Sequence, residues 1–208
     1  MSKDSKEILT RVNHLQDGAS SRDLYDDWSK NYDAHLLDDF GYISPQIAAQ
    51  TLAGRSEQQD IDIVDYGCGT GLVGVELVKQ GFTTVDGVDI SPGMLGQARE
   101  KEVYRNLVCG DLTTQVALDD AVYDVAICVG SMGAGHVGAQ HVPELLRPLK
   151  SGGLFIITIN SMHFAPEGFE LAFRQLEDAG LWRILILEEF NYMTQLDRPG
   201  WLVLAEKH

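Results

Sequence analysis

The sequence predicts a doubly wound α/β fold, in which helices cover both faces of a mostly parallel sheet. Apolar strand-like runs alternate with helix-like segments from Ile61 onward, at the spacing of βαβ units. The first run, 61–64, leads into three glycines at alternate positions, Gly67, Gly69 and Gly71, and then into a helix-like segment. A chain of 208 residues with 44% hydrophobic residues is long enough to bury such a core as one domain.

Composition and charge limit the classes of function. The net charge is −15, and nucleic-acid backbones attract basic surfaces, so we expect no nucleic-acid partner. The cysteines Cys68, Cys109 and Cys128 lie in or beside apolar runs without zinc-like spacing, so we expect reduced thiols and no metal site. The N-terminus lacks a signal-peptide core, and no apolar run approaches the roughly 18 residues of a membrane span. We therefore expect a cytoplasmic protein with no membrane partner.

Residues 1–55 are predicted to form a helical cap, or lid, on a core of residues 56–208 within one compact domain. The clearest feature of the cap is an aromatic stripe, Tyr25, Trp28 and Tyr32, at i, i+3 and i+7 on an otherwise acidic segment. This spacing places the three rings on one helical face. The stripe fits either a surface helix packed on the core or a cover over a binding cleft.

The order of elements follows from apolar runs and from their start and stop signals. The predicted strands are residues 61–64, 83–90, 106–109, 123–129, 154–160, 183–190 and 201–205. The predicted helices are residues 44–53, 72–79, 94–102, 141–149 and 166–179. Gly81 and Gly180 mark helix ends, and Ser91-Pro92 supplies an N-cap and a first-turn proline. The last two strands enclose a loop that contains Pro199-Gly200.

The glycine-rich turn after the first strand is a candidate binding loop. Glycine permits positive φ and lets a ligand approach the backbone where a Cβ would block it. The free N–H groups at the start of the next helix then face the ligand. Gly69, Gly71 and Gly74 also match the G-x-G-x-x-G fingerprint of dinucleotide-binding folds. The turn alone therefore leaves the identity of the ligand open.

Three residues at equal intervals extend this site. Gly67, Asp89 and Asp111 are 22 residues apart, each at the carboxyl end of a successive predicted strand. In an open parallel sheet these ends line one crevice, where ligands bind. Asp89 can accept from both hydroxyls of a ribose, and Ile90 offers an apolar face to adenine. Asp111 can accept from the adenine amine, while the N–H of Leu112 serves a ring nitrogen.

Asp65-x-Gly67-x-Gly69-x-Gly71 resembles the first motif of the class I S-adenosylmethionine-dependent methyltransferases. The resemblance implies S-adenosylmethionine as cofactor, with Asp65 supporting its methionine end and the glycines passing beneath it. The segment from Tyr25 to Asp33 resembles the Tyr-Asp…Tyr-Asp pattern that caps the cofactor and substrate cleft in many of these enzymes. The predicted cofactor-binding residues are Tyr32, Asp65, Gly67, Cys68, Gly69, Gly71, Asp89, Ile90, Asp111, Leu112 and Val129.

Four later segments carry a narrower resemblance. They are similar to the methyltransferase-like family of the Williams–Beuren syndrome chromosomal region, and the resemblance covers the chain from about Tyr25 to its end. The segments are Val129-Gly130-Ser131, Val142-Pro143-Glu144-Leu145, Lys150-Ser151-Gly152-Gly153 and residues 176–182. The family plan implies a seven-stranded sheet of order 3-2-1-4-5-7-6 with an antiparallel seventh strand.

Two other functions stay open at the level of sequence. A small NAD-dependent oxidoreductase would use the same crevice, although no tyrosine is followed by lysine four positions later, as the short-chain type requires. A non-catalytic protein that binds S-adenosylmethionine without turnover would carry the same motifs.

For a methyltransferase we expect a small-molecule acceptor, because no Asn-Pro-Pro-Tyr-type motif follows the fourth predicted strand. A general base is needed only if the acceptor atom arrives protonated. His136, after the fourth strand, is the best-placed candidate, followed by Asn160 and His163 after the fifth. Each of the three also fits a solvated or helix-capping loop residue, so the catalytic residues stay unassigned.

Overall fold

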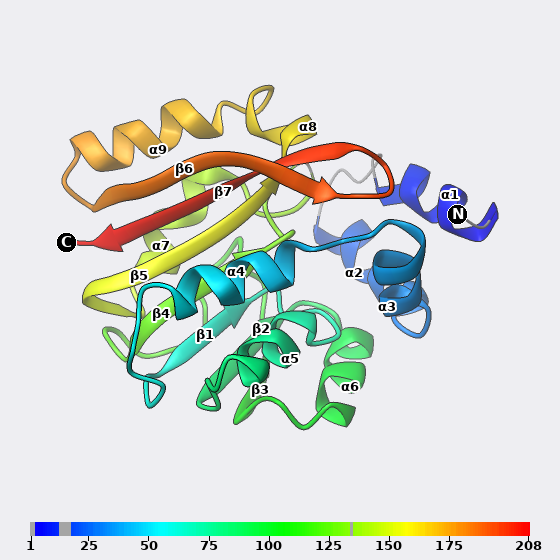
Figure 1. Ribbon diagram of the computed structural model, residues 1–208, viewed down its shortest axis with the longest axis horizontal. Helices are drawn as coiled ribbons and strands as arrows, with labels where there is room; N and C mark the ends of the chain where they lie inside the picture. The colour runs from blue at the N-terminus through cyan, green and yellow to red at the C-terminus, as the bar shows by residue number, and fades with distance from the viewer. Residues whose placement is uncertain (1–2, 13–17, 134) are drawn as a thin grey trace.

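A computed structural model describes residues 3–12, 18–133 and 135–208. Its centre is one seven-stranded sheet of order β3-β2-β1-β4-β5-β7-β6 (Figure 1), which confirms the predicted fold class and strand order. Strands β1 to β5 are parallel, and β7 runs antiparallel to both β5 and β6. The strands are β1 Ile63–Tyr66, β2 Val85–Asp89, β3 Asn106–Cys109, β4 Tyr123–Val129, β5 Leu149–Asn160, β6 Trp182–Met193 and β7 Arg198–Lys207.

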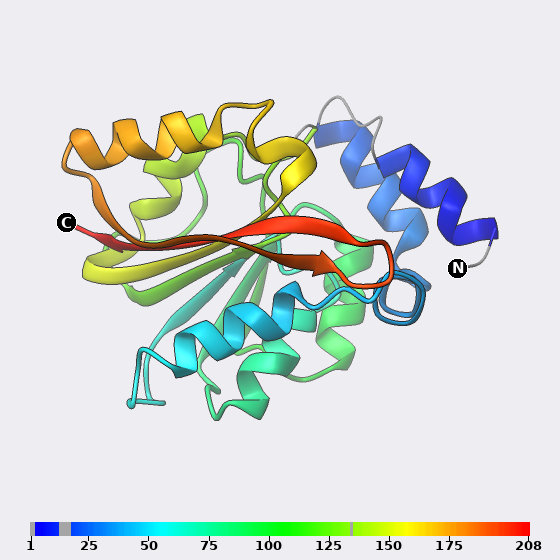
Figure 2. The same ribbon diagram turned by 45° about the horizontal axis from the view of Figure 1, so that its top comes forward.

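Helices cover both faces of this sheet (Figure 2). One face carries α4 Ser44–Ala53, α5 Leu72–Lys79 and α6 Pro92–Glu100. The other face carries α7 Val142–Leu146, α8 Ser161–Phe164 and α9 Phe169–Asp178, with the short 3-10 helix η2 Ala139–His141 before α7. Successive residues of a strand point to opposite faces. Ile63 of β1 accordingly packs in the same cluster as Leu77 of α5, whereas Val64 packs in the cluster that holds Phe173 of α9.

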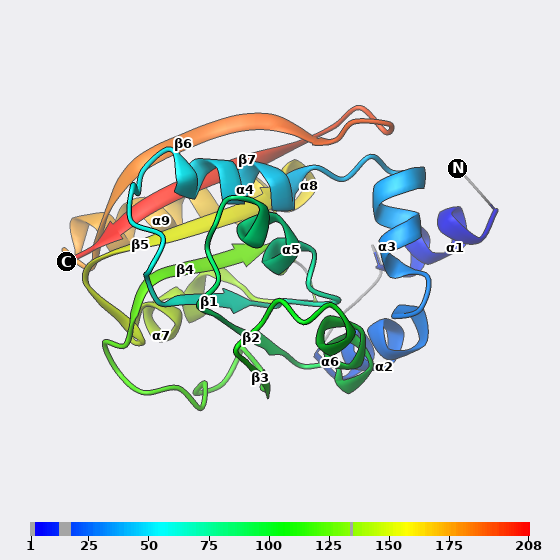
Figure 3. The ribbon, with the colours of Figure 1, turned by 60° about the horizontal axis from the view of Figure 1, so that its bottom comes forward.

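The N-terminal helices lie beyond the carboxyl ends of the parallel strands, at the edge toward which β1 and β4 point (Figure 3). They are α1 Lys3–Val12, α2 Gly18–Trp28, α3 Tyr32–Ala34 and the π-helix η1 His35–Asp39. Trp28 of the predicted aromatic stripe is buried, while Tyr25 and Tyr32 are partly buried. The stripe therefore faces the body of the protein. Whether residues 1–55 behave as a separate unit stays a prediction.

The ends of the chain's last strands differ most from the sequence-based expectation. The strand β5 begins at Leu149, five residues before the predicted start, and β7 includes Pro199 and Gly200, which were expected in a loop. Pro199 and Gly200 pair with Asn191 and Phe190 of β6, because the hairpin of β6 and β7 extends past the apolar centre of the sheet. Its tip bonds to the N-terminal part of the chain, where Gly41 O accepts from Thr194 N at 3.0 Å. Because these strand ends are polar and pair through tertiary contacts, the sequence contains no apolar run that would predict them.

Candidate functional site

A pocket of about 690 Å³ opens at the carboxyl ends of β1, β2, β3 and β4. Its lining includes eight of the predicted cofactor residues: Tyr32, Gly67, Gly69, Asp89, Ile90, Asp111, Leu112 and Val129. Tyr25, Met94, Gly110, Thr113, Gly130, Ser131, Gly135, His136 and Val137 complete the described lining. We refer to it as the first pocket.

The turn requires glycine for two reasons, its backbone conformation and the space around its Cα atoms. Gly67, Gly69 and Gly71 have φ values of 69°, 54° and 94°, a region that residues with a Cβ rarely adopt. A Cβ on Gly67 would lie 1.9 Å from Ser131 Oγ, whereas one on Gly69 would meet no atom closer than 4.0 Å. The turn thus presents bare backbone to the pocket, as a site for a nucleoside cofactor requires. Gly71 instead packs behind the turn, where a Cβ would lie 3.0 Å from the ring of Tyr104.

Asp89 is held rigidly at the end of β2. Its Oδ2 accepts from Gly69 N at 2.8 Å and its Oδ1 from Ser91 N at 2.9 Å. Burial raises the pKa of this carboxyl, and the backbone N–H groups of Ser91, Gly69 and Ile90 oppose that rise. Each oxygen keeps a further lone pair, so the carboxylate can accept from two neighbouring hydroxyls, as the ribose prediction requires. Ser91 also confirms its predicted N-cap role, because its Oγ accepts from Met94 N at 3.0 Å.

The opposite side of the first pocket is formed after β3. Asp111 Oδ1 accepts from Thr113 N at 2.8 Å and from Thr113 Oγ1 at 2.7 Å, which fixes the turn that carries Leu112. Met94, in the first turn of α6, joins Ile90 in the apolar part of the lining. Thr113 and Met94 were missed by the sequence analysis, although Thr113 directly follows Leu112 and Met94 lies in the helix that follows Ile90.

Asp65 lies in the interior rather than on the lining of either pocket. It is completely buried, and its Oδ2 accepts from the hydroxyl of Tyr104 at 2.7 Å. Its Oδ1 has no hydrogen-bond partner among the described residues. Burial raises the pKa of Asp65 to about 7. An unsatisfied carboxylate oxygen beneath the glycine turn suits a cationic amine above it, so the residues present fit the methionine end of the cofactor.

Cys68 and Gly71, like Asp65, are absent from the described lining of the first pocket. Cys68 is buried behind the turn, and burial raises the pKa of its thiol. Their roles as cofactor-binding residues stay predictions. Tyr104, the partner of Asp65, lies 39 positions further along the chain, and no local pattern around it signals that contact.

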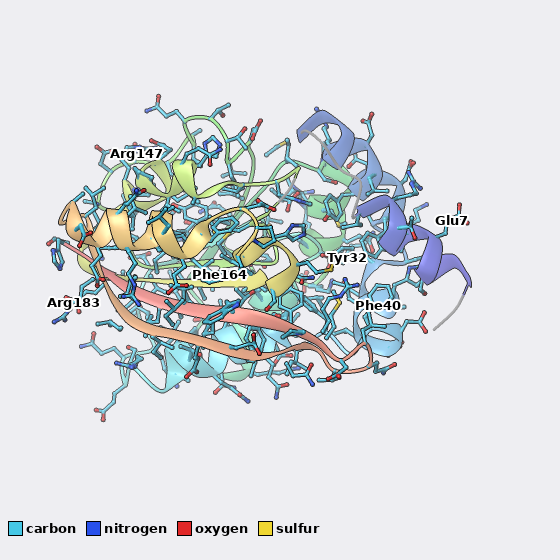
Figure 4. The ribbon with its side chains drawn as sticks, turned by 90° about the horizontal axis from the view of Figure 1, so that it is seen from above. Glu7, Tyr32, Phe40, Arg147, Phe164 and Arg183 are labelled. Atoms are coloured by element: carbon cyan, nitrogen blue, oxygen red, sulfur yellow. The ribbon has the colours of Figure 1, made fainter. Side chains whose placement is uncertain are left out.

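A second pocket of about 650 Å³ adjoins the first and shares four lining residues with it: Tyr25, Tyr32, Gly130 and His136. It contains all three candidate general bases, His136, Asn160 and His163. The remaining described lining residues are Val12, Trp28, Leu36, Phe40, Tyr42, Met132, Tyr192, Met193 and Arg198. Figure 4 shows Tyr32 and Phe40 at this end of the molecule, far from Arg147 and Arg183.

The shared wall between the two pockets has a defined hydrogen bond. The hydroxyl of Tyr25 lies 2.8 Å from Nε2 of His136. Burial raises the pKa of Tyr25, so its phenol stays neutral. The indole of Trp28 stacks against Tyr25 with centroids 6.0 Å apart and meets Tyr32 edge-on at 4.6 Å. Tyr25 and Tyr32 of the aromatic stripe thus line both pockets, and Trp28 lines the second.

The other two candidate bases are already engaged in local structure. Asn160 caps α8, where its Oδ1 accepts from Met162 N at 3.0 Å. His163 Nδ1 lies 2.8 Å from Glu167 Oε1. These contacts match the helix-capping and loop roles considered for Asn160 and His163. Among the three candidates, His136 is the one that lines both pockets. No observation tests a catalytic role for any of the three.

Two aspartates attach the N-terminal helices to the core beside the first pocket. Asp26 Oδ1 accepts from Gly93 N at 2.8 Å and from Ser91 Oγ. Asp33 Oδ2 pairs with Lys101 Nζ at 2.7 Å, and its Oδ1 accepts from Thr70 Oγ1. Asp26 therefore reaches the same serine whose N–H holds Asp89. The acidic character of the segment was noted in the sequence, but these partners are 37 to 68 residues away.

Comparison with known proteins gives one consistent result. Residues 63–153 match the family model described as a methyltransferase domain. Human methyltransferase-like protein 27 is 34% identical over 192 residues, which cover 86% of this chain and 76% of that protein. A crystal structure of an S-adenosylmethionine-dependent methyltransferase from Mesorhizobium loti superimposes with a TM-score of 0.60 at 20% identity, covering 77% of this chain and 98% of that one.

Further relatives overturn the expectation of a small-molecule acceptor without a nucleic-acid partner. Human EEF1A lysine methyltransferase 2 is 33% identical over 54% of this chain and 55% of its own length. The 18S rRNA (guanine-N(7))-methyltransferase RID2 of Arabidopsis thaliana is 39% identical over 69% of this chain and 52% of its own length. The expectation was wrong because the net charge describes the whole surface, whereas the acceptor is selected by the residues around the active site. The missing Asn-Pro-Pro-Tyr motif excludes only one kind of methylation loop.

The part of the chain that the structure describes contains no helix with both the length and the apolarity of a membrane span.

Proposed function

We propose, for a chain that belongs to the class I S-adenosylmethionine-dependent methyltransferases, that the first pocket holds S-adenosylmethionine and the second receives the acceptor. The protein is a methyltransferase that uses this cofactor, and the NAD-dependent and non-catalytic alternatives are set aside. The observation that carries the assignment of the pockets is their shared wall of Tyr25, Tyr32, Gly130 and His136. A methyl donor and an acceptor placed in adjoining pockets meet at this wall.

The cofactor roles follow from the geometry of the strand ends. Asp89 would accept from the ribose hydroxyls, because two backbone donors already fix its carboxylate. Ile90 and Met94 would contact the adenine ring, and Asp111 would accept from its amine through the oxygen not engaged by Thr113. Asp65 would support the methionine amine through the glycine turn.

When bound, S-adenosylmethionine supplies an electrophilic methyl group on its sulfonium, so the protein need not activate the donor. The residues of the shared wall align the acceptor with that methyl, an effect that is worth up to ~7–11 kcal/mol. Tyr25 and Tyr32 would shield the sulfonium through their ring faces. If the acceptor atom arrives protonated, His136 would take the proton, with the Tyr25 hydroxyl fixing the orientation of its ring.

For the acceptor we propose a residue of a protein or of a nucleic acid. The relatives named for rRNA and for lysine methylation support a macromolecular acceptor. In this proposal a single side chain or base would enter the second pocket, while the rest of the macromolecule stays outside. We also propose a cytoplasmic location, which the free Cys68, Cys109 and Cys128 support.

The cofactor assignment is tested by thermal unfolding with S-adenosylmethionine, S-adenosylhomocysteine or NAD. At 100-fold excess over Kd a ligand stabilises by ~2.7 kcal/mol, which at roughly 2–4 °C per kcal/mol for this chain length shifts Tm by several degrees. We expect this shift with both sulfur compounds and none with NAD. A shift with NAD alone would contradict the cofactor assignment.

The acceptor class is tested by incubating the protein with labelled S-adenosylmethionine and a cell extract. Label that is lost after protease digestion identifies a protein acceptor, and label lost after ribonuclease identifies RNA. Label that survives both treatments, passes a small-pore filter and separates by chromatography from unreacted S-adenosylmethionine would contradict a macromolecular acceptor. An Asp89→Asn protein serves as the matched control for transfer by other enzymes in the extract.

A further inference from the structure

The second pocket contains a cationic side chain, Arg198, for which the described part of the chain supplies no hydrogen-bond or ion-pair partner. Arg198 is the first residue of β7, is partly buried, and lines this pocket. Among the described residues its guanidinium makes neither a hydrogen bond nor an ion pair. Arg105 and Arg147 behave differently, since they pair with Asp86 at 2.7 Å and with Glu144 at 2.8 Å. Arg55 and Arg99 also lack an ion pair among the described residues, but they are exposed to solvent, whereas Arg198 is partly buried.

The pocket lining around Arg198 is largely aromatic, with Tyr25, Trp28, Tyr32, Phe40, Tyr42 and Tyr192 among its described residues. No aspartate or glutamate occurs in the described lining of the second pocket. Burial lowers the pKa of Arg198, and the hydroxyl of Tyr192 opposes that change. A guanidinium remains charged in proteins, so this partly desolvated cation has lost water without gaining a counter-charge. A ligand anion would supply the missing charge.

Arg198 is also close to the place of transfer. Tyr192, which lies beside it, has its hydroxyl 3.4 Å from that of Tyr42. Both hydroxyls pack on Gly130, where a Cβ would lie 2.5 Å from Tyr42 Oη and 3.1 Å from Tyr192 Oη. Gly130 belongs to the wall shared with the first pocket. Arg198 therefore lines the same pocket as the tyrosine pair that packs on Gly130 of the shared wall.

We propose that Arg198 binds a carboxylate of the acceptor and so selects substrates that carry this group near the methylated atom. The planar guanidinium fork matches a carboxylate through two parallel hydrogen bonds. A carboxylate is favoured over backbone phosphates because the described lining offers one arginine and no lysine, whereas nucleic-acid backbones engage several cations at once. This assignment rests on the second pocket being the acceptor site.

The role of Arg198 is tested by NMR titration, which measures ligand binding to protein that is saturated with S-adenosylhomocysteine. The probes are succinate, its neutral counterpart succinamide, inorganic phosphate and uridine 5′-monophosphate. The variants are Arg198→Gln, Arg198→Lys and, as control, Arg183→Gln, whose side chain is 58% exposed and pairs with Glu206 at 3.2 Å. The affinity for S-adenosylhomocysteine is measured in parallel for each protein.

We expect succinate, but not succinamide, to bind the wild type and the Arg183→Gln control. Arg198→Gln should weaken succinate binding by about 10- to 100-fold, and Arg198→Lys should lie between the two because it keeps the charge without the fork. Unchanged affinity for S-adenosylhomocysteine shows that each variant is folded. Failure of S-adenosylhomocysteine to bind the wild type would instead contradict the cofactor site itself.

Three results would overturn the proposal. Succinate that does not bind the wild type, or that binds Arg198→Gln equally well, removes Arg198 as a carboxylate site. Phosphate or uridine 5′-monophosphate that binds more tightly than succinate, and only when Arg198 is present, would assign the residue to a nucleic-acid phosphate instead.

Discussion

The hydroxyl of Tyr25 lies 2.8 Å from Nε2 of His136, although the two residues are 111 positions apart. Tyr25 belongs to α2 of the N-terminal helices, and His136 to the loop after β4. The contact lies in the wall that both pockets share. Docking of the N-terminal helices and orientation of the candidate base are therefore linked through one hydrogen bond.

The linked arrangement leads to a prediction about the N-terminal helices as a lid. Ordering some thirty residues costs ~1–2 kcal/mol each in backbone entropy, and the aromatic stripe alone offers limited apolar area. We expect hydrogen exchange over residues 25–32 to slow when S-adenosylhomocysteine binds, because the ligand completes the surface under the stripe. Such closure would also exclude water from the transfer. Equal protection with and without ligand would show a fixed segment.

Two variants distinguish the specific hydrogen bonds of Asp26 from the general effect of negative charge on the N-terminal helices. Asp26→Ala removes the acceptor for Gly93 N and Ser91 Oγ, whereas Asp27→Ala changes an exposed neighbour. Losing a hydrogen bond to a charged group costs ~1.5–3 kcal/mol. We expect Asp26→Ala to lower the protection of residues 25–32 and to weaken S-adenosylhomocysteine binding, with Asp27→Ala close to wild type. Similar behaviour of the two variants would contradict the role of Asp26.

The two buried aspartates should contribute unequally to cofactor affinity. Asp89→Asn should weaken S-adenosylhomocysteine binding about tenfold or more relative to Asp65→Asn, because each ribose hydroxyl left without its charged acceptor costs ~1–3 kcal/mol. Calorimetric Kd values for both isosteric variants provide the comparison. Equal Kd values would reduce Asp89 to a residue that only shapes the loop.

Asp65 should make the ligand-free protein less stable as pH rises. Its pKa is raised by burial from 3.8 to about 7 in the folded protein. Between these two pH values the folded state retains a proton that the unfolded state has lost, so the free energy of unfolding falls as pH increases. The full effect is on the order of 4 kcal/mol, at 1.36 kcal/mol per pKa unit, and is complete above about pH 7.

Urea unfolding from pH 4 to pH 8 tests this dependence. Asp65→Asn should reduce the fall in that window and leave the contribution of Asp89, whose pKa is also raised by burial, while Asp60→Asn, at an exposed position, should keep the full fall. A wild-type curve that parallels the Asp65→Asn curve would show that this carboxyl does not titrate in the window.

Tyr32 should help to distinguish the charged cofactor from its neutral product. A cation over an aromatic face gains ~0.5–2 kcal/mol, and Tyr32 lines both pockets. Tyr32→Leu should therefore lower the preference for S-adenosylmethionine over S-adenosylhomocysteine by roughly 2- to 30-fold. Tyr32→Phe keeps the ring face and should retain the preference. The ratio of the two Kd values is the measurement, and a ratio unaffected by Tyr32→Leu would rule out the shielding role.

The parts of the fold that sequence predicts well are those with local signals. The strands β3 and β4 and the helix α5 have the predicted bounds, because each is a short apolar run between turn residues. Asp89 and Asp111 were found because residues that end adjacent parallel strands must meet at one edge of the sheet. The bounds of β7 were missed because its first residues pair through the docking of the hairpin tip, which is a tertiary contact.

The second pocket shows why the rest of the site resists prediction. Tyr42, Tyr192 and Arg198 come together because the β6–β7 hairpin bonds to the segment before α4, with an isolated bridge between Tyr42 and Met193. Contacts across 150 residues depend on the angle and length of the hairpin. The spacing of residues in the sequence predicts neither the angle nor the length of the hairpin.

The origin of the second pocket also has a consequence for redesign. Of its described lining residues, Gly130, Met132 and His136 fall within 63–153, the segment that matches the methyltransferase domain family. The others come from the two ends of the chain, before α4 and from the end of β5 onward. If the second pocket receives the acceptor, as proposed, exchanging both ends with those of a relative should change the choice of substrate. Tyr25 and Tyr32, which also line the first pocket, and Asp26, which bonds to Ser91 and Gly93, would have to be retained in such a chimera.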